Sequence, residues 1–195
     1  MSRVRKHERP SVALLEEELN RVKYTQRYRM VLRSTVYTLI TVAAIAVLVA
    51  TLWLPVLQIY GSSMTPTLCD GEIVFSVKTA DLEPGEVIAF YYNNKILVKR
   101  VIAGPGDWVD VHPETGDVSV NGEVLDEPYL VEKSYGDADI EFPYQVPDEK
   151  IFVMGDHRST SVDSRHVAVG CVAQEQIVGK IVFRVWPLEV FGGIS

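Results

Sequence analysis

The uncharged run from Ser34 to Leu57 constrains this chain more than any other feature. It contains no Asp, Glu, Lys, Arg or His over 24 positions. A helix of that length can cross the ~30 Å hydrocarbon core of a bilayer with some tilt. A cleavable signal peptide has a hydrophobic region of only ~7–15 residues and lies at the start of a chain. A buried core helix would show a polar face, and this run shows none. We therefore predict a retained transmembrane helix over residues 34–57.

Charge is distributed unequally on the two sides of this run. Residues 1–33 carry nine Lys and Arg against four Glu, whereas the rest of the chain carries ten Lys and Arg against 22 Asp and Glu. Basic segments stay on the cytoplasmic side of membranes. We therefore place residues 1–33 in the cytoplasm as a basic segment and residues 58–195 outside it, in a single-pass protein of the plasma membrane. The lipid bilayer is thus one predicted partner, and the acidic part argues against nucleic acid as another.

Within the basic segment, apolar residues recur at helical spacing over residues 14–22, which predicts a short amphipathic helix. This helix either contacts a partner or a lipid surface, or belongs to a solvated tail.

After residue 57 the pattern changes to short segments rich in Val, Ile, Phe and Tyr, which Gly, Pro and Asn interrupt. Such segments predict many short strands, and Asn121-Gly122 predicts a two-residue hairpin turn. We expect a mainly β protein, in which an N-terminal transmembrane helix precedes an extracytoplasmic all-β domain. Residues 126–149 are acidic and weakly periodic, and we interpret them as a surface excursion. The predicted strands cover residues 72–78, 86–92, 95–103, 107–111, 117–120, 123–125, 150–154, 168–173 and 176–186.

Three stretches of this domain carry reactive side chains. Residues 61–68 (GSSMTPTL) place a serine among small residues, just after the apolar run. Residues 96–101 (ILVKRV) place a lysine inside an apolar strand. Residues 155–165 (GDHRSTSVDSR) form a polar segment. Each stretch by itself also fits a purely structural role: a turn, an edge-strand lysine and a solvated loop.

A serine hydroxyl needs a base to remove its proton before it can act as a nucleophile. Histidine is the usual base, so a triad of Ser63, His157 and Asp163 is one interpretation. Lys99 is the other, because alternate strand residues share a face and Lys99 therefore projects between two aliphatic side chains. Burial at such a place lowers the pKa of an amine. A metal site built from residues 156, 157, 163 and 166 matches no common ligand spacing, and we predict no metal.

Together these stretches resemble the type I signal peptidases. The pattern of that family has Ser followed by Met-x-Pro-Thr-Leu, then Lys-Arg before a Gly-x-Pro-Gly-Asp-like turn. It continues with Gly-Asp-Asn-Arg and Ser-x-Asp-Ser-Arg. In this chain the corresponding places are residues 63–68, 99–107, 155–158 and 161–165, in the same order. The resemblance extends over residues 35–190.

The resemblance implies a membrane-bound serine endopeptidase that removes signal peptides from secreted preproteins and needs no cofactor. It implies that Ser63 is the nucleophile and that Lys99 is the general base. Ser161 is then expected to orient Lys99, and Asp163 with Arg165 to form a structural ion pair. The substrate would be the signal peptide of a preprotein.

Two positions depart from the family pattern, and two others are implied substrate contacts. His157 stands in place of the usual Asn. Gly61 stands where some members have a second Ser, so the oxyanion hole must rest on backbone N–H groups that include that of Ser63. Shallow apolar pockets for small substrate residues are implied at Ile59 and Val98.

Two other functions use some of the same features. A self-cleaving protease of the repressor type also uses a Ser/Lys dyad, although a membrane span argues against it. A non-catalytic, membrane-anchored binding domain would need neither Ser63 nor Lys99. The two cysteines, Cys69 and Cys171, match no metal motif and either form a disulfide or are two buried thiols.

Overall fold

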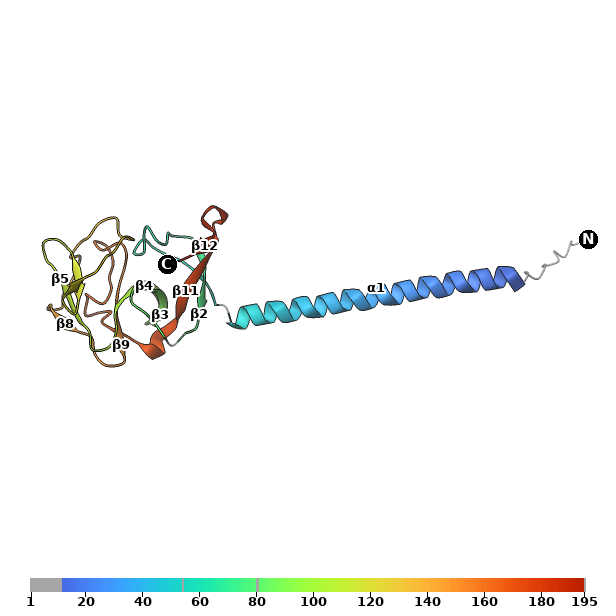
Figure 1. Cartoon of the computed structure of the whole chain (residues 1–195), viewed down its shortest axis with the longest axis horizontal. Coiled ribbons are helices and arrows are strands. Elements are labelled where there is room, and N and C mark those ends of the chain that lie inside the picture. Colours follow the sequence, from blue (N-terminus) through green and yellow to red (C-terminus); the bar gives the residue numbers. More distant parts are fainter. Residues whose placement is uncertain (1–11, 54, 80, 195) are drawn as a thin grey trace, which may run out of the picture. The chain divides into compact units, whose positions relative to one another are not determined.

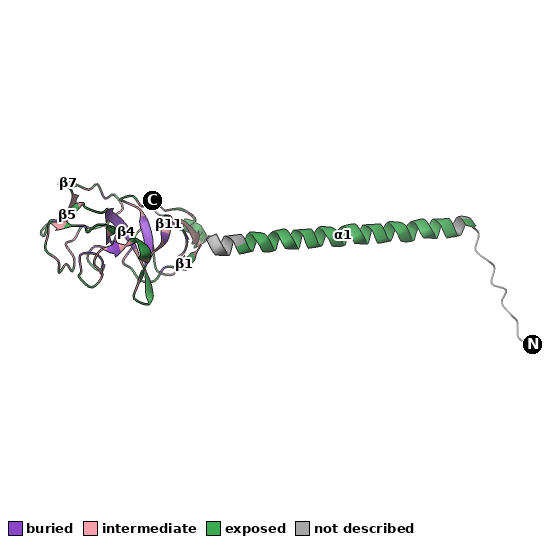
Figure 2. Ribbon diagram, turned by 90° about the horizontal axis from the view of Figure 1, so that it is seen from below, coloured by how far each residue is buried: buried purple, intermediate pink, exposed green. Residues whose placement is uncertain are grey.

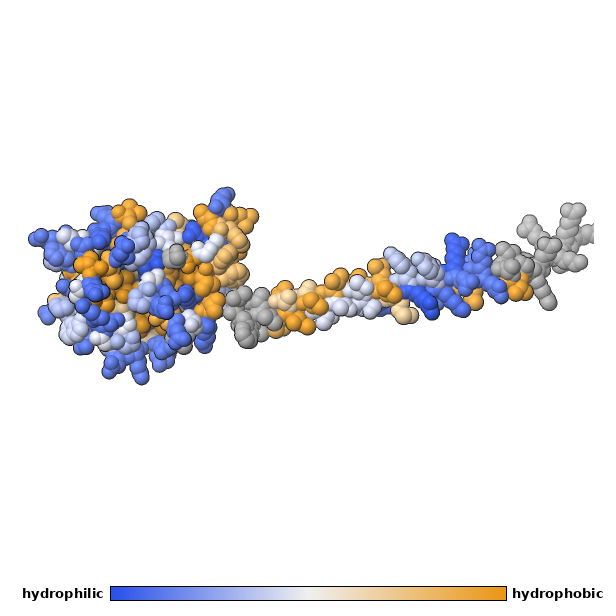
Figure 3. All heavy atoms as spheres, viewed as in Figure 1, coloured by the Kyte–Doolittle hydropathy of each residue, from blue (hydrophilic) through white to orange (hydrophobic). Residues whose placement is uncertain are grey.

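The computed structural model describes residues 12–53, 55–79 and 81–194. Its N-terminal part is one α-helix, α1 (Val12–Trp53), so the predicted short helix and the predicted span are continuous (Figure 1). Every side chain described between residues 15 and 48 is exposed (Figure 2). By length and composition, Leu15–Leu48 can cross a membrane. Hydrophobic side chains gather on the C-terminal half of α1 and hydrophilic ones on its N-terminal half (Figure 3).

Helix α1 ends at Trp53, so the predicted end at residue 57 was wrong. Pro55 accounts for the difference, because proline has no backbone N–H and disfavours a helical residue before it. Leu54 lies outside the described residues. Val56 and Leu57 belong instead to strand β1 (Val56–Gln58), which pairs antiparallel with β2.

The remainder of the chain is a β domain, as predicted from the sequence. Its larger sheet has the strand order β1-β2-β11-β3-β4-β9-β10, with β12 paired to β11, and its smaller sheet has the order β7-β6-β5-β8. All of these pairings are antiparallel. Beyond β1, the strands are β2 (Ile73–Val77), β3 (Val87–Tyr92), β4 (Lys95–Ala103), β5 (Trp108–Val111), β6 (Val118–Val120), β7 (Glu123–Val124), β8 (Tyr144–Gln145), β9 (Lys150–Met154), β10 (Val172–Ala173), β11 (Ile177–Trp186) and β12 (Gly192–Gly193); two 3₁₀ turns are Gln174–Gln176 and Leu188–Val190.

Each predicted strand segment contains one strand, and the Asn121-Gly122 turn joins β6 to β7 as predicted. The sequence did not indicate β1, β8 or β12, which are only two or three residues long.

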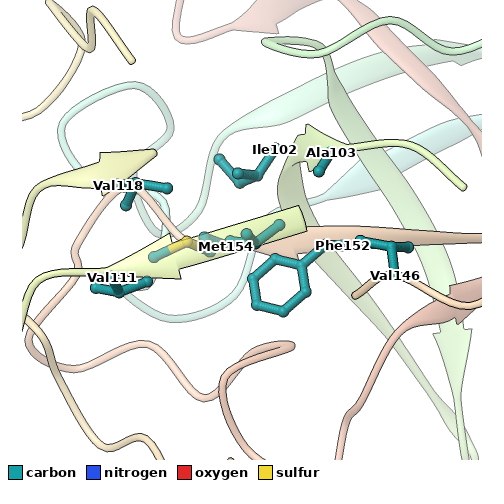
Figure 4. Packing of buried hydrophobic residues seen from close by; sticks show 8 residues of the cluster. Ile102, Ala103, Val111, Val118, Val146, Phe152 and Met154 are labelled. Carbon is teal, nitrogen blue, oxygen red and sulfur yellow. The ribbon is translucent and has the colours of Figure 1, made fainter. Parts of the chain in front are cut away.

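A hydrophobic cluster lies between strands of the two sheets. Figure 4 shows Ile102 and Ala103 of β4 and Phe152 and Met154 of β9 beside valines of the smaller sheet. Residues 126–149 contribute to this cluster through the buried Val146 and through Tyr135, Ile140 and Phe142. The segment is largely exposed, as a surface excursion would be, but it also buries several apolar side chains, which the sequence did not indicate.

Candidate active site

The turn that carries Ser63 follows β1 and precedes β2. Met64 and Leu68 are buried in a second cluster, against side chains of β2 and β11. The amide of Leu68 donates to the carbonyl of Met64 at 2.8 Å, and that of Thr65 donates to the carbonyl of Ser62 at 3.1 Å. The two buried apolar side chains hold the turn against the core, and Ser63 itself is half-buried and accessible.

Lys99 lies on β4 opposite Ile88 of β3, and only 3% of it is exposed. Its Nζ lies 2.6 Å from Ser63 Oγ, within hydrogen-bond distance. Burial lowers the pKa of the Lys99 amine from 10.5 to about 8. The carboxylates of Asp163 and Asp156 act in the opposite direction, and Arg165 adds to the lowering. A substantial fraction of Lys99 is therefore neutral at mildly alkaline pH and able to accept a proton.

The polar segment after β9 contains a buried ion pair between Asp163 and Arg165. Arg165 Nε donates to Asp163 Oδ1 at 2.9 Å, and neither side chain is exposed. The family resemblance implied such a pair, and the two residues lie in the irregular segment after β9. Burial raises the pKa of Asp163, yet the Arg165 guanidinium and the Gly155 amide outweigh it and the pKa is lowered. Asp163 is therefore charged, and its pairing with Arg165 satisfies both buried charges.

Gly155 of the polar segment packs against the turn that carries Ser63. A Cβ atom on Gly155 would lie 2.2 Å from Ser161 Oγ and 2.5 Å from the Ser63 carbonyl oxygen. The amide of His157 donates to that same Ser63 carbonyl at 3.1 Å. The absence of a side chain at Gly155 thus allows the two segments to touch.

The predicted hydrogen bond between Ser161 and Lys99 is not formed. Ser161 is buried, and its Oγ forms no hydrogen bond with Lys99 among the described residues; it lies close enough to Asp163 to contribute to the lowered pKa of that carboxyl group. The expected role of Ser161 in orienting Lys99 stays a prediction.

The alternative triad is not assembled either. His157 Nδ1 lies 3.2 Å from Thr65 Oγ1, and no hydrogen bond among the described residues joins the imidazole to Ser63 Oγ or to Asp163.

Two further buried ion pairs surround the site, and sequence reasoning missed both. Arg100 donates to both carboxylate oxygens of Asp156, at 3.0 and 2.8 Å. Arg158 forms a two-bonded pair with Glu127, and neither side chain is exposed. The motifs contained Arg100, Asp156 and Arg158 without indicating their partners. Nothing in the acidic composition around Glu127 singled it out.

The backbone around Ser63 can supply an oxyanion hole. Gly61 has a φ of 87°, which favours glycine over a residue with a side chain and accounts for its presence here. Its amide donates to Asp70 Oδ1 at 2.7 Å. By contrast, no hydrogen bond of the described residues uses the Ser63 amide, which is therefore available to an oxyanion.

A cleft of about 790 Å³ opens beside Ser63. One wall comes from residues 57–61 and 64, and the other from residues 94–98 at the start of β4. Ile59 and Val98, the predicted pocket residues, both line this cleft. Among the described residues, no group of three or more His, Cys, Asp and Glu is placed to hold a metal ion. Cys69 is exposed and Cys171 half-buried, and they form no disulfide.

Comparison with known proteins identifies the family. The sequence model of the signal peptidases of peptidase family S26 matches residues 32–186. The chain belongs to this family. Signal peptidase IB of Staphylococcus aureus is 42% identical over 154 residues, which cover 68% of this chain and 78% of that protein. Signal peptidase I of Bacillus amyloliquefaciens is 34% identical over 162 residues, which cover 77% and 86%.

One solved structure similar to this member of the S26 family is the crystal structure of a signal peptidase I from Enterococcus faecalis. It is 28% identical with a TM-score of 0.44, and the match covers 51% of this chain and 96% of that one. The match to the family model and the two curated relatives confirm the sequence-based resemblance to the type I signal peptidases at the level of the family.

Proposed function

We propose that this chain is a signal peptidase I that removes signal peptides from secreted preproteins with a Ser63/Lys99 dyad. The observation that carries the proposal is the 2.6 Å distance between Ser63 Oγ and Lys99 Nζ in a site where burial lowers the lysine pKa to about 8. A neutral amine at hydrogen-bond distance is the base that a serine nucleophile requires.

The reaction follows from these positions. Ser63 Oγ attacks the carbonyl carbon of the scissile peptide while neutral Lys99 takes the hydroxyl proton. The Ser63 amide stabilises the negative charge that develops on the carbonyl oxygen. Lys99 then gives its proton to the leaving amine, and the mature protein departs. Neutral again, Lys99 activates a water molecule that hydrolyses the acyl-enzyme ester and regenerates Ser63.

The cleft supports an extended peptide as substrate. Residues 95–99 of β4 pair with β3 on one side only, because pairing with β9 begins at Arg100. An unpaired strand edge can accept a further strand through main-chain hydrogen bonds. Ile59 and Val98 line the cleft with apolar side chains, so the adjoining substrate positions should favour small apolar residues.

The N-terminal helix fits a membrane anchor. Basic residues at its N-terminal end favour the cytoplasm for that end by the positive-inside rule, which supports a catalytic domain on the opposite side. Ser63 lies ten positions after the end of α1 at Trp53, a span of at most about 35 Å of extended chain. The nucleophile is therefore tethered within reach of the membrane surface, where signal peptides emerge.

The test compares cleavage of a purified preprotein by the full-length wild type in lipid vesicles with cleavage by Ser63→Ala, Lys99→Ala and Lys99→Arg. All three variants should lose activity; Lys99→Arg should do so because a guanidinium is not deprotonated in this pH range. Matched controls are Ser62→Ala and Lys78→Ala, both at exposed positions, which should cleave like the wild type. Full activity of Ser63→Ala or Lys99→Ala would refute the dyad, and cleavage of the chain itself would favour a self-processing protease.

A further inference from the structure

Glu127 and Tyr129 form a small buried contact group outside the strands. They lie between β7 and β8, in the stretch whose sequence is acidic and only weakly periodic. Glu127 is 6% exposed and Tyr129 is half-buried. An unpaired buried carboxylate is strongly destabilising. The partners of the Glu127 carboxylate therefore indicate the role of this residue. Both of its contacts lead towards the catalytic dyad.

The first chain of contacts runs through Arg158. Glu127 holds this arginine through both carboxylate oxygens in a fully buried pair. Arg158 Nε in turn donates to the carbonyl of Gly155 at 3.1 Å. Two positions after Gly155, the amide of His157 donates to the carbonyl of Ser63 at 3.1 Å. Glu127 therefore fixes the segment that holds the backbone of the nucleophile.

The second chain of contacts runs through Arg100. The ring of Tyr129 lies over the Arg100 guanidinium, 3.9 Å from its carbon to the ring centroid. The hydroxyl of Tyr129 donates to Glu127 Oε1 at 2.8 Å. This hydrogen bond connects the contacts through Arg100 with the contacts through Arg158. Arg100 immediately follows Lys99 on β4 and binds Asp156 through two hydrogen bonds. Asp156 also accepts a hydrogen bond of 2.5 Å from Thr67, in the turn of Ser63.

We propose that Glu127 and Tyr129 are positioning residues that brace the dyad, so that Ser63 and Lys99 stay within hydrogen-bond distance and shielded from water. The brace contacts both members of the dyad through their neighbours: Arg100 on the lysine side, and His157 and Thr67 on the serine side. This inference rests on the proposed function. It assigns a task to a segment that carries none of the family motifs found in the sequence.

A brace and a purely structural contact predict different kinetics. Neither Glu127 nor Tyr129 lines the cleft, so removing the brace should lower kcat with little change in KM. Water that enters around Arg100 and Asp156 relieves the burial that dominates the pKa of Lys99, while Asp163, Asp156 and Arg165 remain the charges facing it. The pKa of Lys99 should then rise towards 10.5, and the acidic limb of the rate profile should move to higher pH.

The experiment measures kcat and KM for a preprotein from pH 6 to 10, with the full chain in lipid vesicles. Tyr129→Ala should reduce kcat at pH 7 by about tenfold or more and regain part of it at pH 9.5. Tyr129→Phe keeps the ring on Arg100 and loses only the hydroxyl, so its acidic limb should lie close to that of the wild type. Glu127→Gln keeps the shape but not the charge opposite Arg158, and its loss of kcat should be intermediate.

A matched control separates positioning from stability. Tyr144 is a half-buried tyrosine of the smaller sheet that packs on Phe152, and no hydrogen bond or ion pair of the described residues joins it to the pairs around the dyad. Tyr144→Ala should lower thermal stability as Tyr129→Ala does, without moving the acidic limb. A wild-type acidic limb in Tyr129→Ala, or an equal shift in Tyr144→Ala, would overturn the brace.

A second readout does not depend on turnover. Competitive acylation of Lys99 at different pH values, followed by mass spectrometry, reports the pKa of its amine in every variant. A higher value in Tyr129→Ala than in the wild type supports the brace, and an equal value refutes it. A wild type that cleaves no preprotein would count against the proposed function alone, since the labelling result still decides the inference.

Discussion

Replacing Lys99 with methionine should abolish peptidase activity and, at the same time, stabilise the folded chain at neutral pH. The methionine side chain is about as long as the aliphatic part of the buried lysine side chain, and it has no ionisable group. The lysine is destabilising because burial disfavours its charged form, which the unfolded chain keeps in water. Replacing a buried ionisable group by an apolar one of similar volume is often stabilising.

The magnitude follows from the pKa of Lys99. Folding lowers this pKa from 10.5 to about 8, and each unit corresponds to ~1.4 kcal/mol, so the cost to folding is about 3 kcal/mol below pH 8. Between pH 8 and 10.5 the unfolded chain binds more protons at this position than the folded chain, so stability rises with pH and the cost disappears. Loss of the contact with Ser63 subtracts ~1 kcal/mol. The net gain from Lys99→Met should therefore be about 2 kcal/mol at pH 7.

Urea denaturation of the detergent-solubilised full chain, followed by tryptophan fluorescence at pH 7 and pH 10, measures this difference. Trp108 and Trp186 lie in the β domain and report on its unfolding. Lys78→Met, at an exposed position, is the matched control and should change stability little at either pH. The reasoning is refuted if Lys99→Met is less stable than the wild type at pH 7, or if the difference between them is the same at pH 10.

Two further predictions concern the geometry and titration of the site. Wild-type kcat/KM should rise about tenfold between pH 7 and pH 9, because the neutral fraction of Lys99 rises from ~9% to ~91% for a pKa of about 8; a flat profile would contradict lysine as the base. Gly155→Ala should reduce kcat by at least about tenfold, because its methyl group would occupy space held by the Ser63 carbonyl and Ser161 Oγ. Gly192→Ala, where no atom lies within 4 Å of an added Cβ, is its control, and equal activity of the two variants would argue against the close contact.

The longer strands could be predicted from the sequence because their own residues specify them. β-Branched and aromatic residues between Gly, Pro and Asn give β3, β4 and β11 their positions without any tertiary information. The two- and three-residue strands β1 and β12 could not be predicted. They exist only because β2 and β11 offer partners at the edge of the sheet.

The candidate dyad could be predicted because Ser63 and Lys99 each lie in a recognisable local motif. The ion pairs that surround it could not, since Arg100 and Asp156 are 56 positions apart and Glu127 and Arg158 are 31 positions apart. The absence of a hydrogen bond between Ser161 Oγ and Lys99 was also beyond prediction, because the orientation of one hydroxyl depends on the packing around Gly155. Local pattern thus indicated the candidate reacting groups, whereas their electrostatic surroundings depend on tertiary structure.

Those surroundings explain why Lys99 in particular can lose its proton. Among the buried charged residues of the described β domain, each arginine and each carboxylate has an ion-pair partner, whereas Lys99 has none. A paired charge is stabilised by its partner and resists titration, but an unpaired buried amine can lower its cost only by becoming neutral. Asp156 and Asp163 would each favour the charged amine, and Arg100 and Arg165 occupy their oxygens. In the proposed mechanism the arginines therefore contribute without touching a substrate, by preventing the nearest carboxylates from pairing with Lys99.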